Sequence, residues 1–321
     1  MRRRVERDCW CGARTARLVA NVRVPDGARF PLVRCEGCKV YALFPQPDDA
    51  TLAHYYSNEY YGNSRKKFIG PVAKFVGFFQ GGRARHVARE VNRHRRCEEP
   101  RLLDVGCGNG GFLMQMQQRG FAVEGTEWTA DSARRIPASA GIPVHVGDLL
   151  TLDLPEKSFD AITLWHVFEH LRQPDKTLEK IHRLLKPGGL LFLAMPNHES
   201  WQAQRFGTNW FHLDPPRHLF GFGVKSLSAL LRLRKFQLLA ASTFSFEQNP
   251  YGYLQSVLNS RGWPRDRAYG VLKGTSRDAF ATKLMDLMRV ALLVPAALLY
   301  AVAEWRAGRG GTVTVVARKR G

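Results

Sequence analysis

The sequence is short of acidic residues and of long apolar runs. Its 321 residues include 28 Asp and Glu against 48 Lys and Arg, which gives a formal net charge of +20 at pH 7. This imbalance favours anionic partners, namely nucleic acid, anionic lipid or phosphorylated small molecules, and a solvated basic surface is the alternative. A disordered chain is excluded, because 45% of the residues are hydrophobic and can form a sizeable packed core.

No apolar stretch of comfortable bilayer length is present. The longest, residues 290–303, falls short of the roughly 20 residues that a spanning helix needs, and Pro295 would kink it. We expect a peripheral membrane contact through residues 284–306, with a buried core helix or a dimer interface as the alternatives. The N-terminal region also lacks a central apolar run, so we expect no signal peptide and a cytoplasmic protein, peripheral on the inner face of the membrane where it touches lipid.

Cysteine is scarce, and most of it lies near the N-terminus. Cys9 and Cys11 form one pair, and Cys35 and Cys38 form another. In a reducing compartment such pairs are more often thiols or metal ligands than disulfides. Four thiolates at this spacing can surround a structural zinc ion and staple a segment too short for a core of its own. The first pair is CxC rather than CxxC, which leaves Asp8 as a substitute ligand and a metal-free ribbon as the alternative.

The most informative segment, residues 102–111, is a short apolar strand that runs into a glycine-rich turn. Its glycines satisfy the spacing of a dinucleotide-binding turn: Gly106, Gly108 and Gly111. Asp104 argues against a dinucleotide, because a carboxylate two residues before the first glycine would repel a pyrophosphate from the helix N-terminus. The same carboxylate would attract the ammonium and sulfonium groups of S-adenosylmethionine. Glu127, about twenty residues further on, completes the pattern of a nucleotide-cofactor site.

From Arg101 onward, strand and helix signals alternate as in βαβ units, which predicts an α/β fold with a doubly wound, largely parallel sheet. The expected strands are 101–106, 121–126, 142–147, 158–164, 189–195, 236–245 and 312–319. The expected helices are 110–119, 130–139, 174–185 and 224–234, preceded by a basic helix over 72–97. Pro187-Gly188-Gly189 is expected to form the turn before the fifth strand.

Residues 100–246 with 312–319 resemble a class I S-adenosylmethionine-dependent methyltransferase of the type 11/23-like group. The resemblance implies a seven-stranded Rossmann-like sheet in the order 3-2-1-4-5-7-6, with the last strand antiparallel. The predicted domains are a zinc-ribbon-like module (1–45), an aromatic and basic helical linker (46–98), the methyltransferase domain (99–247 plus 311–321) and an inserted apolar and basic helical segment (248–310).

The resemblance also implies the cofactor contacts. The glycine turn would approach the methionine part of the cofactor, and Glu127 would accept hydrogen bonds from both ribose hydroxyls. Asp148 would contact the adenine amino group, with a helix N-cap or turn residue as its alternative role. The predicted cofactor-binding residues are Asp104, Gly106, Gly108, Gly110, Glu127, Trp128, Asp148, Leu149 and Trp165.

Two histidines are the candidate catalytic residues. His166 ends the fourth strand and is expected beside the sulfonium. In the similar ubiquinone-type O-methyltransferases a Glu-His pair resembling Glu169-His170 has a metal role, but His166 replaces the acidic partner there, so we expect a structural pair here. His218 lies in an aromatic segment, 197–222, expected to act as a lid, and is either a general base for an acceptor hydroxyl or a hydrogen-bonded lid residue.

The cysteine module followed by this fold is similar to methyltransferases of nucleotide-linked sugars and of cell-surface polysaccharide intermediates. We therefore expect methyl transfer to a small-molecule, sugar-nucleotide or lipid-linked acceptor, in polysaccharide or natural-product biosynthesis. Methylation of ribosomal or transfer RNA is the first alternative, and a non-catalytic interaction protein is the second. Nucleic acid is the less expected partner, because RNA binding does not require an apolar insertion. The sequence does not determine the acceptor atom or the oligomeric state.

Overall fold

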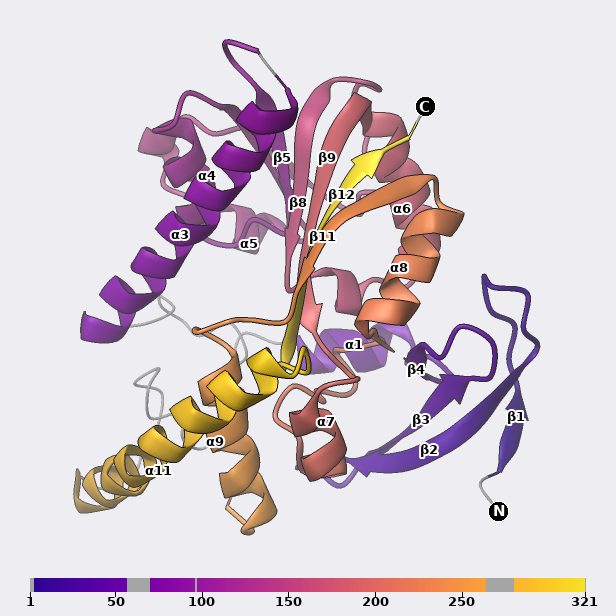
Figure 1. Cartoon of the computed structure of the whole chain (residues 1–321), viewed down its shortest axis with the longest axis vertical. Helices are drawn as coiled ribbons and strands as arrows, with labels where there is room; N and C mark the ends of the chain where they lie inside the picture. Colours follow the sequence, from indigo (N-terminus) through magenta and orange to yellow (C-terminus); the bar gives the residue numbers. More distant parts are fainter. Residues whose placement is uncertain (1–2, 57–69, 96, 264–279, 321) are drawn as a thin grey trace. The chain divides into compact units, whose positions relative to one another are not determined.

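The computed structural model describes residues 3–56, 70–95, 97–263 and 280–320 (Figure 1). The chain divides into two units. Unit 1 comprises residues 1–73, 196–227 and 242–313, and unit 2 comprises residues 74–195, 228–241 and 314–321. The domain boundaries expected from the sequence stay predictions, and parts of the expected linker and insertion, 57–69 and 264–279, lie outside the described residues.

Unit 2 is built on a seven-stranded mixed sheet. Its strands, in spatial order, are β11 (Phe236–Ser242), β12 (Thr312–Lys319), β9 (Leu185–Pro196), β8 (Phe159–Trp165), β5 (Arg101–Val105), β6 (Ala122–Glu127) and β7 (Val144–Val146). Pairing is parallel from β9 across to β7. Figure 1 shows β12 running against this direction between β9 and β11. The predicted strand order and fold class are confirmed.

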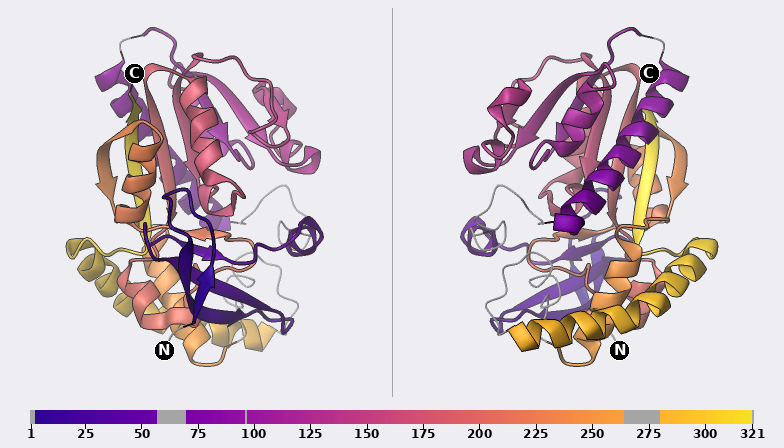
Figure 2. Two further views of the ribbon diagram at one scale, coloured as in Figure 1. Left: turned by 90° about the vertical axis from the view of Figure 1, so that its right-hand side faces the viewer. Right: turned by 90° about the vertical axis from the view of Figure 1, so that its left-hand side faces the viewer.

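Helices cover both faces of this sheet. They are α3 (Gly70–His94), α4 (Gly111–Gln117), α5 (Ala130–Ala133), α6 (Pro174–Leu184) and α8 (Val224–Leu233). Figures 1 and 2 show α3 and α4 on one face and α6 and α8 on the other. Ala84, Val87 and Val91 recur at helical spacing along α3 and lie in the same buried cluster as Phe112 and Phe192. This core fixes the strand ends that carry the predicted site.

Two predicted elements are wrong in extent. The helix expected over 130–139 is a single turn, α5, followed by the 3₁₀ turn η1 (Ala138–Ala140), because Pro137 cannot donate a helical hydrogen bond. The turn expected at Pro187-Gly188-Gly189 lies inside β9 instead. Phe159 pairs with Leu185, but Ala161 pairs with Leu190, so the extra residues form a bulge, and Gly188 supplies its positive φ of 73°.

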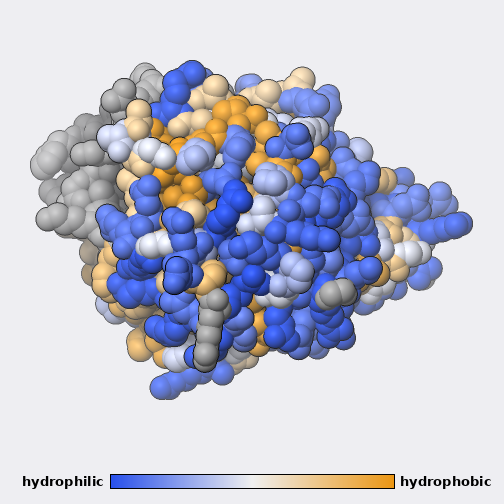
Figure 3. All heavy atoms as spheres, turned by 90° about the horizontal axis from the view of Figure 1, so that it is seen from above, coloured by the Kyte–Doolittle hydropathy of each residue, from blue (hydrophilic) through white to orange (hydrophobic). Residues whose placement is uncertain are grey.

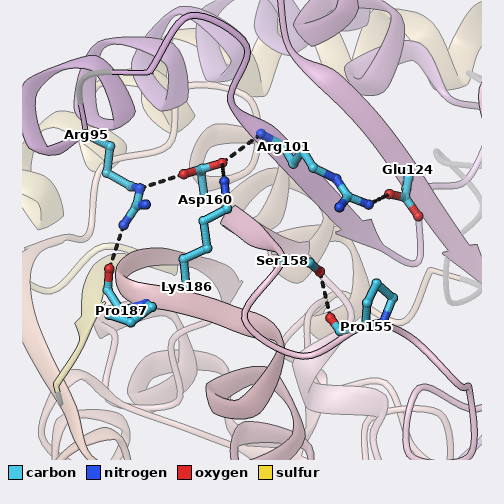
Figure 4. Close-up of polar contacts among 8 residues, drawn as sticks. All are labelled: Arg95, Arg101, Glu124, Pro155, Ser158, Asp160, Lys186 and Pro187. Carbon is cyan, nitrogen blue, oxygen red and sulfur yellow. Dashed lines mark hydrogen bonds and ion pairs between the residues drawn. The ribbon is translucent and has the colours of Figure 1, made fainter.

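An ion-pair network ties together the edge of the sheet where β5 and β8 begin (Figure 4). Asp160 is fully buried; its carboxylate accepts from Arg95 Nε at 2.6 Å, Lys186 Nζ at 2.7 Å and the Arg101 backbone N–H at 3.0 Å. Arg101 in turn pairs with Glu124 at 2.6 Å. The end of α3, the start of β5 and the start of β9 are therefore joined through one carboxylate. Figure 3 shows the surface from above, which is largely hydrophilic, with its most extensive apolar area in the upper half of the view and smaller ones nearer the edges.

Unit 1 contains a second, antiparallel sheet. It is ordered β1 (Arg4–Glu6), β2 (Thr15–Arg23), β3 (Arg29–Cys35), β4 (Tyr41–Leu43) and β10 (Phe220–Gly221). The chain between the two cysteine pairs thus forms β2 and most of β3. The sequence did not indicate β10, which comes from the expected lid segment and extends the cysteine module's sheet.

The remaining helices of unit 1 are α1 (Asp49–Tyr55), α7 (Trp201–Phe206), α9 (Asn249–Ser260) and α11 (Phe280–Arg306). Two 3₁₀ turns complete the described elements: η3 (Gly207–Asn209) in unit 1 and η2 (Phe168–His170) in unit 2.

Among the described helices, α11 is long and apolar enough between Met288 and Arg306 to cross a membrane, and only 17% of that stretch is buried. By length and composition alone this is a weak sign, because helices of soluble proteins can meet the same criteria.

Candidate cofactor site and cysteine cluster

The glycine turn after β5 adopts a backbone that side chains disfavour. Gly106, Gly108 and Gly110 have φ values of 72°, 61° and 72°. A Cβ on Gly106 would lie 2.6 Å from Val167 Cγ2, whereas a Cβ on Gly108 would meet nothing within 4 Å. Gly106 is therefore required by the protein's own packing. Gly108 instead leaves open space in which a ligand can approach the backbone.

Glu127 closes β6 beside this turn. Its Oε1 accepts a hydrogen bond from the Gly108 backbone N–H at 2.5 Å, and its Oε2 accepts from the Trp128 N–H at 3.3 Å. Burial raises the pKa of Glu127, and these two N–H donors partly oppose the rise. A carboxylate accepts up to about four hydrogen bonds, so these contacts leave capacity for a diol. The side chain of Trp128 is 67% exposed at the same strand end.

Asp104 lies deeper than the sequence suggested. It is 2% exposed and accepts a hydrogen bond from Thr163 Oγ1 at 2.5 Å on the neighbouring strand β8. Burial raises its pKa to about 7, while the Thr163 hydrogen bond and the Arg83 charge lower it. Because the carboxylate is buried, Asp104 would attract a cationic cofactor through its electrostatic field.

The third strand end, after β7, also meets this region. Gly147 N–H donates to the Glu127 carbonyl at 2.9 Å. Asp148 Oδ1 accepts from the Leu150 N–H at 3.0 Å, so the carboxylate closes its own turn, as its alternative role predicted. Leu149 is buried beside it. The structure thus brings the ends of β5, β6 and β7 together with their acidic residues.

Trp165 and His166 follow β8. The Trp165 ring packs edge-on against Phe112, with the Arg83 guanidinium 5.6 Å from its centroid. His166 has a φ of 56°, a left-handed conformation rare for residues other than glycine and found mostly at functional sites. Its Nδ1 lies 3.6 Å from the buried Glu169 carboxylate. The two side chains come from neighbouring turns of the segment that follows β8.

Two residues of α3 join this region and were missed in the sequence. Arg83 lies over Trp165 and its charge lowers the pKa of Asp104. Gln80 Oε1 is 2.5 Å from the point where a Cβ on Gly111 would lie. Neither belongs to a strand-end motif. The only sign of them in the sequence was that these two polar side chains flank the Gly81-Gly82 pair of the helix.

The four N-terminal cysteines form one cluster in unit 1. Cys9 Sγ lies 3.6 Å from Cys38 Sγ, Cys11 Sγ lies 3.7 Å from Cys35 Sγ, and all four sulfurs lie within 4.8 Å of one another. A tetrahedral zinc with Zn–S bonds of about 2.3 Å needs sulfurs roughly 3.8 Å apart, so the cluster fits a structural zinc ion. A tight turn in which Gly12 N–H donates to the Cys9 carbonyl at 2.9 Å lets the CxC pair close. Asp8 does not belong to the cluster.

His218 lies in unit 1, whereas His166 lies in unit 2. Its Nδ1 lies 2.9 Å from the His212 carbonyl, which requires a proton on Nδ1 and leaves Nε2 as the basic nitrogen. Arg217 forms a two-point ion pair with Asp214, at 2.8 and 2.6 Å, which fixes the turn that carries His218. The catalytic roles of both histidines stay predictions.

Comparisons with known proteins identify the family of this chain. The family described as "Methyltransferase domain" matches residues 79–241. The chain is 32% identical over 210 residues to the ubiquinone biosynthesis O-methyltransferase of Chelativorans sp. (strain BNC1), covering 61% of this chain and 80% of the relative. It is 29% identical over 116 residues to the protein of the same name from Chromobacterium violaceum, covering 34% of this chain and 50% of that relative. The chain thus spans about half the length of several curated relatives that it matches.

Solved structures agree at the level of the fold. A protein of Galdieria sulphuraria assigned as a sarcosine dimethylglycine methyltransferase superposes with a TM-score of 0.52 at 15% identity, over 85% of this chain and 99% of that one. At this identity the match supports the fold alone.

Proposed function

Since the chain belongs to the class I S-adenosylmethionine-dependent methyltransferases, we propose that it transfers a methyl group to a small-molecule, sugar-nucleotide or lipid-linked acceptor. The observation that carries this proposal is the junction of Gly108 and Glu127. A left-handed glycine with open space beside it contacts a carboxylate that retains acceptor capacity. A ligand with a ribose diol fits this combination, and S-adenosylmethionine supplies the methyl group as a sulfonium.

The strand ends of unit 2 would hold the cofactor. The turn Gly106 to Gly110 lets the ligand approach the backbone, and Glu127 accepts from the ribose hydroxyls. Asp148 and Leu149 border the adenine, and Trp128 covers the adenosine. Asp104, Arg83 and Trp165 surround the methionine part, where Arg83 offers a cation for a carboxylate.

Methyl transfer is an in-line displacement, so alignment of donor and acceptor supplies most of the rate. Positioning alone contributes up to about 7–11 kcal/mol in favourable cases. His166, held in its left-handed conformation next to Glu169, would line the transfer path. If the acceptor is a hydroxyl, one proton must be removed, and His218 with its basic Nε2 is our candidate for that role.

The acceptor class rests on two observations. The curated relatives are named for ubiquinone biosynthesis, which supports a small-molecule acceptor. The net charge of +20 suits a phosphorylated one, and a lipid-linked acceptor accounts for a peripheral membrane contact through 284–306 by a cytoplasmic protein. The likeness of the cysteine module and this fold to methyltransferases of cell-surface polysaccharide intermediates supports a place in polysaccharide or natural-product biosynthesis as part of the proposal. RNA remains the alternative acceptor.

Calorimetric titration of S-adenosylmethionine into Glu127→Ala tests the cofactor assignment. We expect the affinity to fall about tenfold or more, because two charge-assisted hydrogen bonds to the ribose are lost. Glu124→Ala is the matched control, since Glu124 lies on the same strand but pairs with Arg101 and His145. An unchanged affinity in Glu127→Ala would refute the ribose assignment.

The acceptor is tested by turnover to S-adenosylhomocysteine. Lysate separated into membrane lipid, small-molecule and RNA pools is added to the purified protein with labelled S-adenosylmethionine. We expect label to enter the lipid or small-molecule pool. Label confined to RNA would establish the alternative.

A further inference from the structure

Helix α11 has two apolar faces, of which the described residues cover only one. The covered face contains Ala297 and Ala301, which are 1% and 6% exposed, at the spacing of one helix face. Ala297 forms a small core with Leu254 and Leu258 of α9. The packing of this face explains why the helix belongs to unit 1, but it does not explain why the opposite face is apolar.

The opposite face is apolar and exposed. Leu292 and Leu299 are 80% and 74% exposed, and Met288, Val302 and Trp305 are between 40% and 52% exposed. Residues 290–303 contain no charged residue. A helix on the surface of a soluble protein normally carries polar side chains on the face away from its core. The outer face of α11, defined by Met288, Leu292, Leu299, Val302 and Trp305, therefore needs an apolar partner.

The end of this helix is attached to unit 1. Glu304 is fully buried, and its Oε1 accepts from Gln202 Nε2 of α7 at 2.8 Å and from the Gly311 N–H at 3.2 Å. Beyond the helix, the Arg309 carbonyl accepts from the Trp201 N–H at 3.0 Å. A helix that crossed a bilayer would have to break these contacts, and β12, which starts at Thr312, would lose its place between β9 and β11.

The surroundings of the outer face select the partner. Exposed arginines lie at both ends of the apolar stretch, Arg289 and Arg306. The Phe244 ring packs against Trp305 at a tilt of 52°, with the ring centroids 4.9 Å apart, and both residues are nearly half exposed. Aromatic rings and basic residues around an apolar helix face suit the interface of a bilayer with anionic head groups.

We propose that the outer face of α11 is an in-plane anchor for an anionic lipid bilayer, with the inner face and Glu304 fixed on the protein. This proposal deepens the membrane contact of the proposed function and rests on it for its biological use. The helix axis lies along the membrane surface, the leucines enter the acyl boundary, and the arginines meet the head groups.

Flotation of the full-length protein with vesicles tests the anchor. Vesicles of phosphatidylcholine mixed with phosphatidylglycerol should bind the protein, and vesicles of phosphatidylcholine alone should bind it far more weakly. Leu292→Glu and Leu299→Glu should each lower the partition coefficient about tenfold or more, because a buried leucine contributes roughly 1.5–3 kcal/mol. Leu233→Glu is the matched control: Leu233 is 49% exposed on α8 and should leave binding unchanged.

Three results would overturn the anchor: equal binding of the wild type and Leu292→Glu, equal binding to the two kinds of vesicle, or a dimer in solution that Leu292→Glu dissociates without any vesicle binding. The affinity for S-adenosylmethionine is measured in the same variants and should not change, which also shows that they fold. If the wild type binds vesicles but does not bind S-adenosylmethionine, the proposed function is refuted and the anchor is not, because vesicle binding does not depend on cofactor binding.

Discussion

Gly106 and Gly108 look alike in the sequence, but the structure gives them different reasons to be glycine. Val167 crowds the first, whereas nothing within 4 Å crowds the second. Residue spacing reveals a turn, and only the packing around each Cβ shows which glycine the fold itself requires and which leaves open space beside the backbone. Glu127 and Asp104 also have different surroundings. The Glu127 carboxylate lies against the glycine turn, and the Asp104 carboxylate is buried against Thr163.

Gly108→Ala should separate binding from stability. The alanine must adopt a positive φ, which costs roughly 1–2 kcal/mol of folding free energy, and its methyl group would occupy the ligand's space. Gly120→Ala is the control, because Gly120 has a φ of 81° and also meets nothing within 4 Å. Urea unfolding should show similar losses in both variants, and calorimetry should show lost S-adenosylmethionine binding in Gly108→Ala alone. Normal cofactor affinity in that variant would contradict the assignment.

Glu304→Gln should change how stability depends on pH. Burial raises the pKa of Glu304 from 4.5 to about 8, so the folded protein retains a proton that the unfolded chain releases. Stability is therefore highest below pH 4.5 and falls as the pH rises toward 8, by roughly 4–5 kcal/mol from this group. Urea unfolding measured from about pH 5 to about pH 8 should show that the free energy of unfolding of the glutamine variant lacks this part of the decrease. Parallel curves for the two proteins would show that Glu304 does not titrate in this window.

At the scale of elements, the effect of proline and glycine on where a helix or strand ends was the hardest feature to predict. Pro137 shortened α5 as its missing donor requires, but Pro187-Gly188-Gly189 did not end β9. A strand can absorb extra residues as a bulge where its partner supplies pairing on both sides, and β8 does so at Phe159 and Ala161. Local turn chemistry cannot reveal such a partner.

Asp160→Asn tests how three elements are held together. The variant leaves Arg95 and Lys186 without their counter-charge, and we expect a loss of about 2–3 kcal/mol, less than for a fully buried pair because both cations are partly exposed. Thermal unfolding of unit 2 reports the loss, with Asp153→Asn, an exposed carboxylate, as the control. A melting temperature equal to that of the control would show that the network contributes little.

At the scale of the whole molecule, the two units should respond to different ligands. The cysteine cluster lies in unit 1, so we expect one zinc ion per chain, and chelation should speed hydrogen exchange in peptides of β2 and β3. S-adenosylmethionine should instead slow exchange around residues 104–128 of unit 2. Cys11→Ser should reproduce the chelation effect, and Cys97→Ser, an exposed cysteine outside the cluster, should not. Zinc content unchanged in Cys11→Ser would contradict the four-cysteine site.

The sequence by itself determined the α/β class, the family and the cysteine cluster, because each is encoded by residues close together in the chain or by a regular alternation of elements; the sheet order came with the resemblance to the family. Only the tertiary structure decided which carboxylate meets the glycine turn, that Arg83 and Gln80 of α3 join it, that β10 extends the cysteine module's sheet, and that one apolar face of α11 is left uncovered by the part of the chain that the structure describes. These features depend on contacts between residues far apart in the chain. Hydrophobic periodicity shows that a helix has an apolar face, but burial shows whether protein covers it.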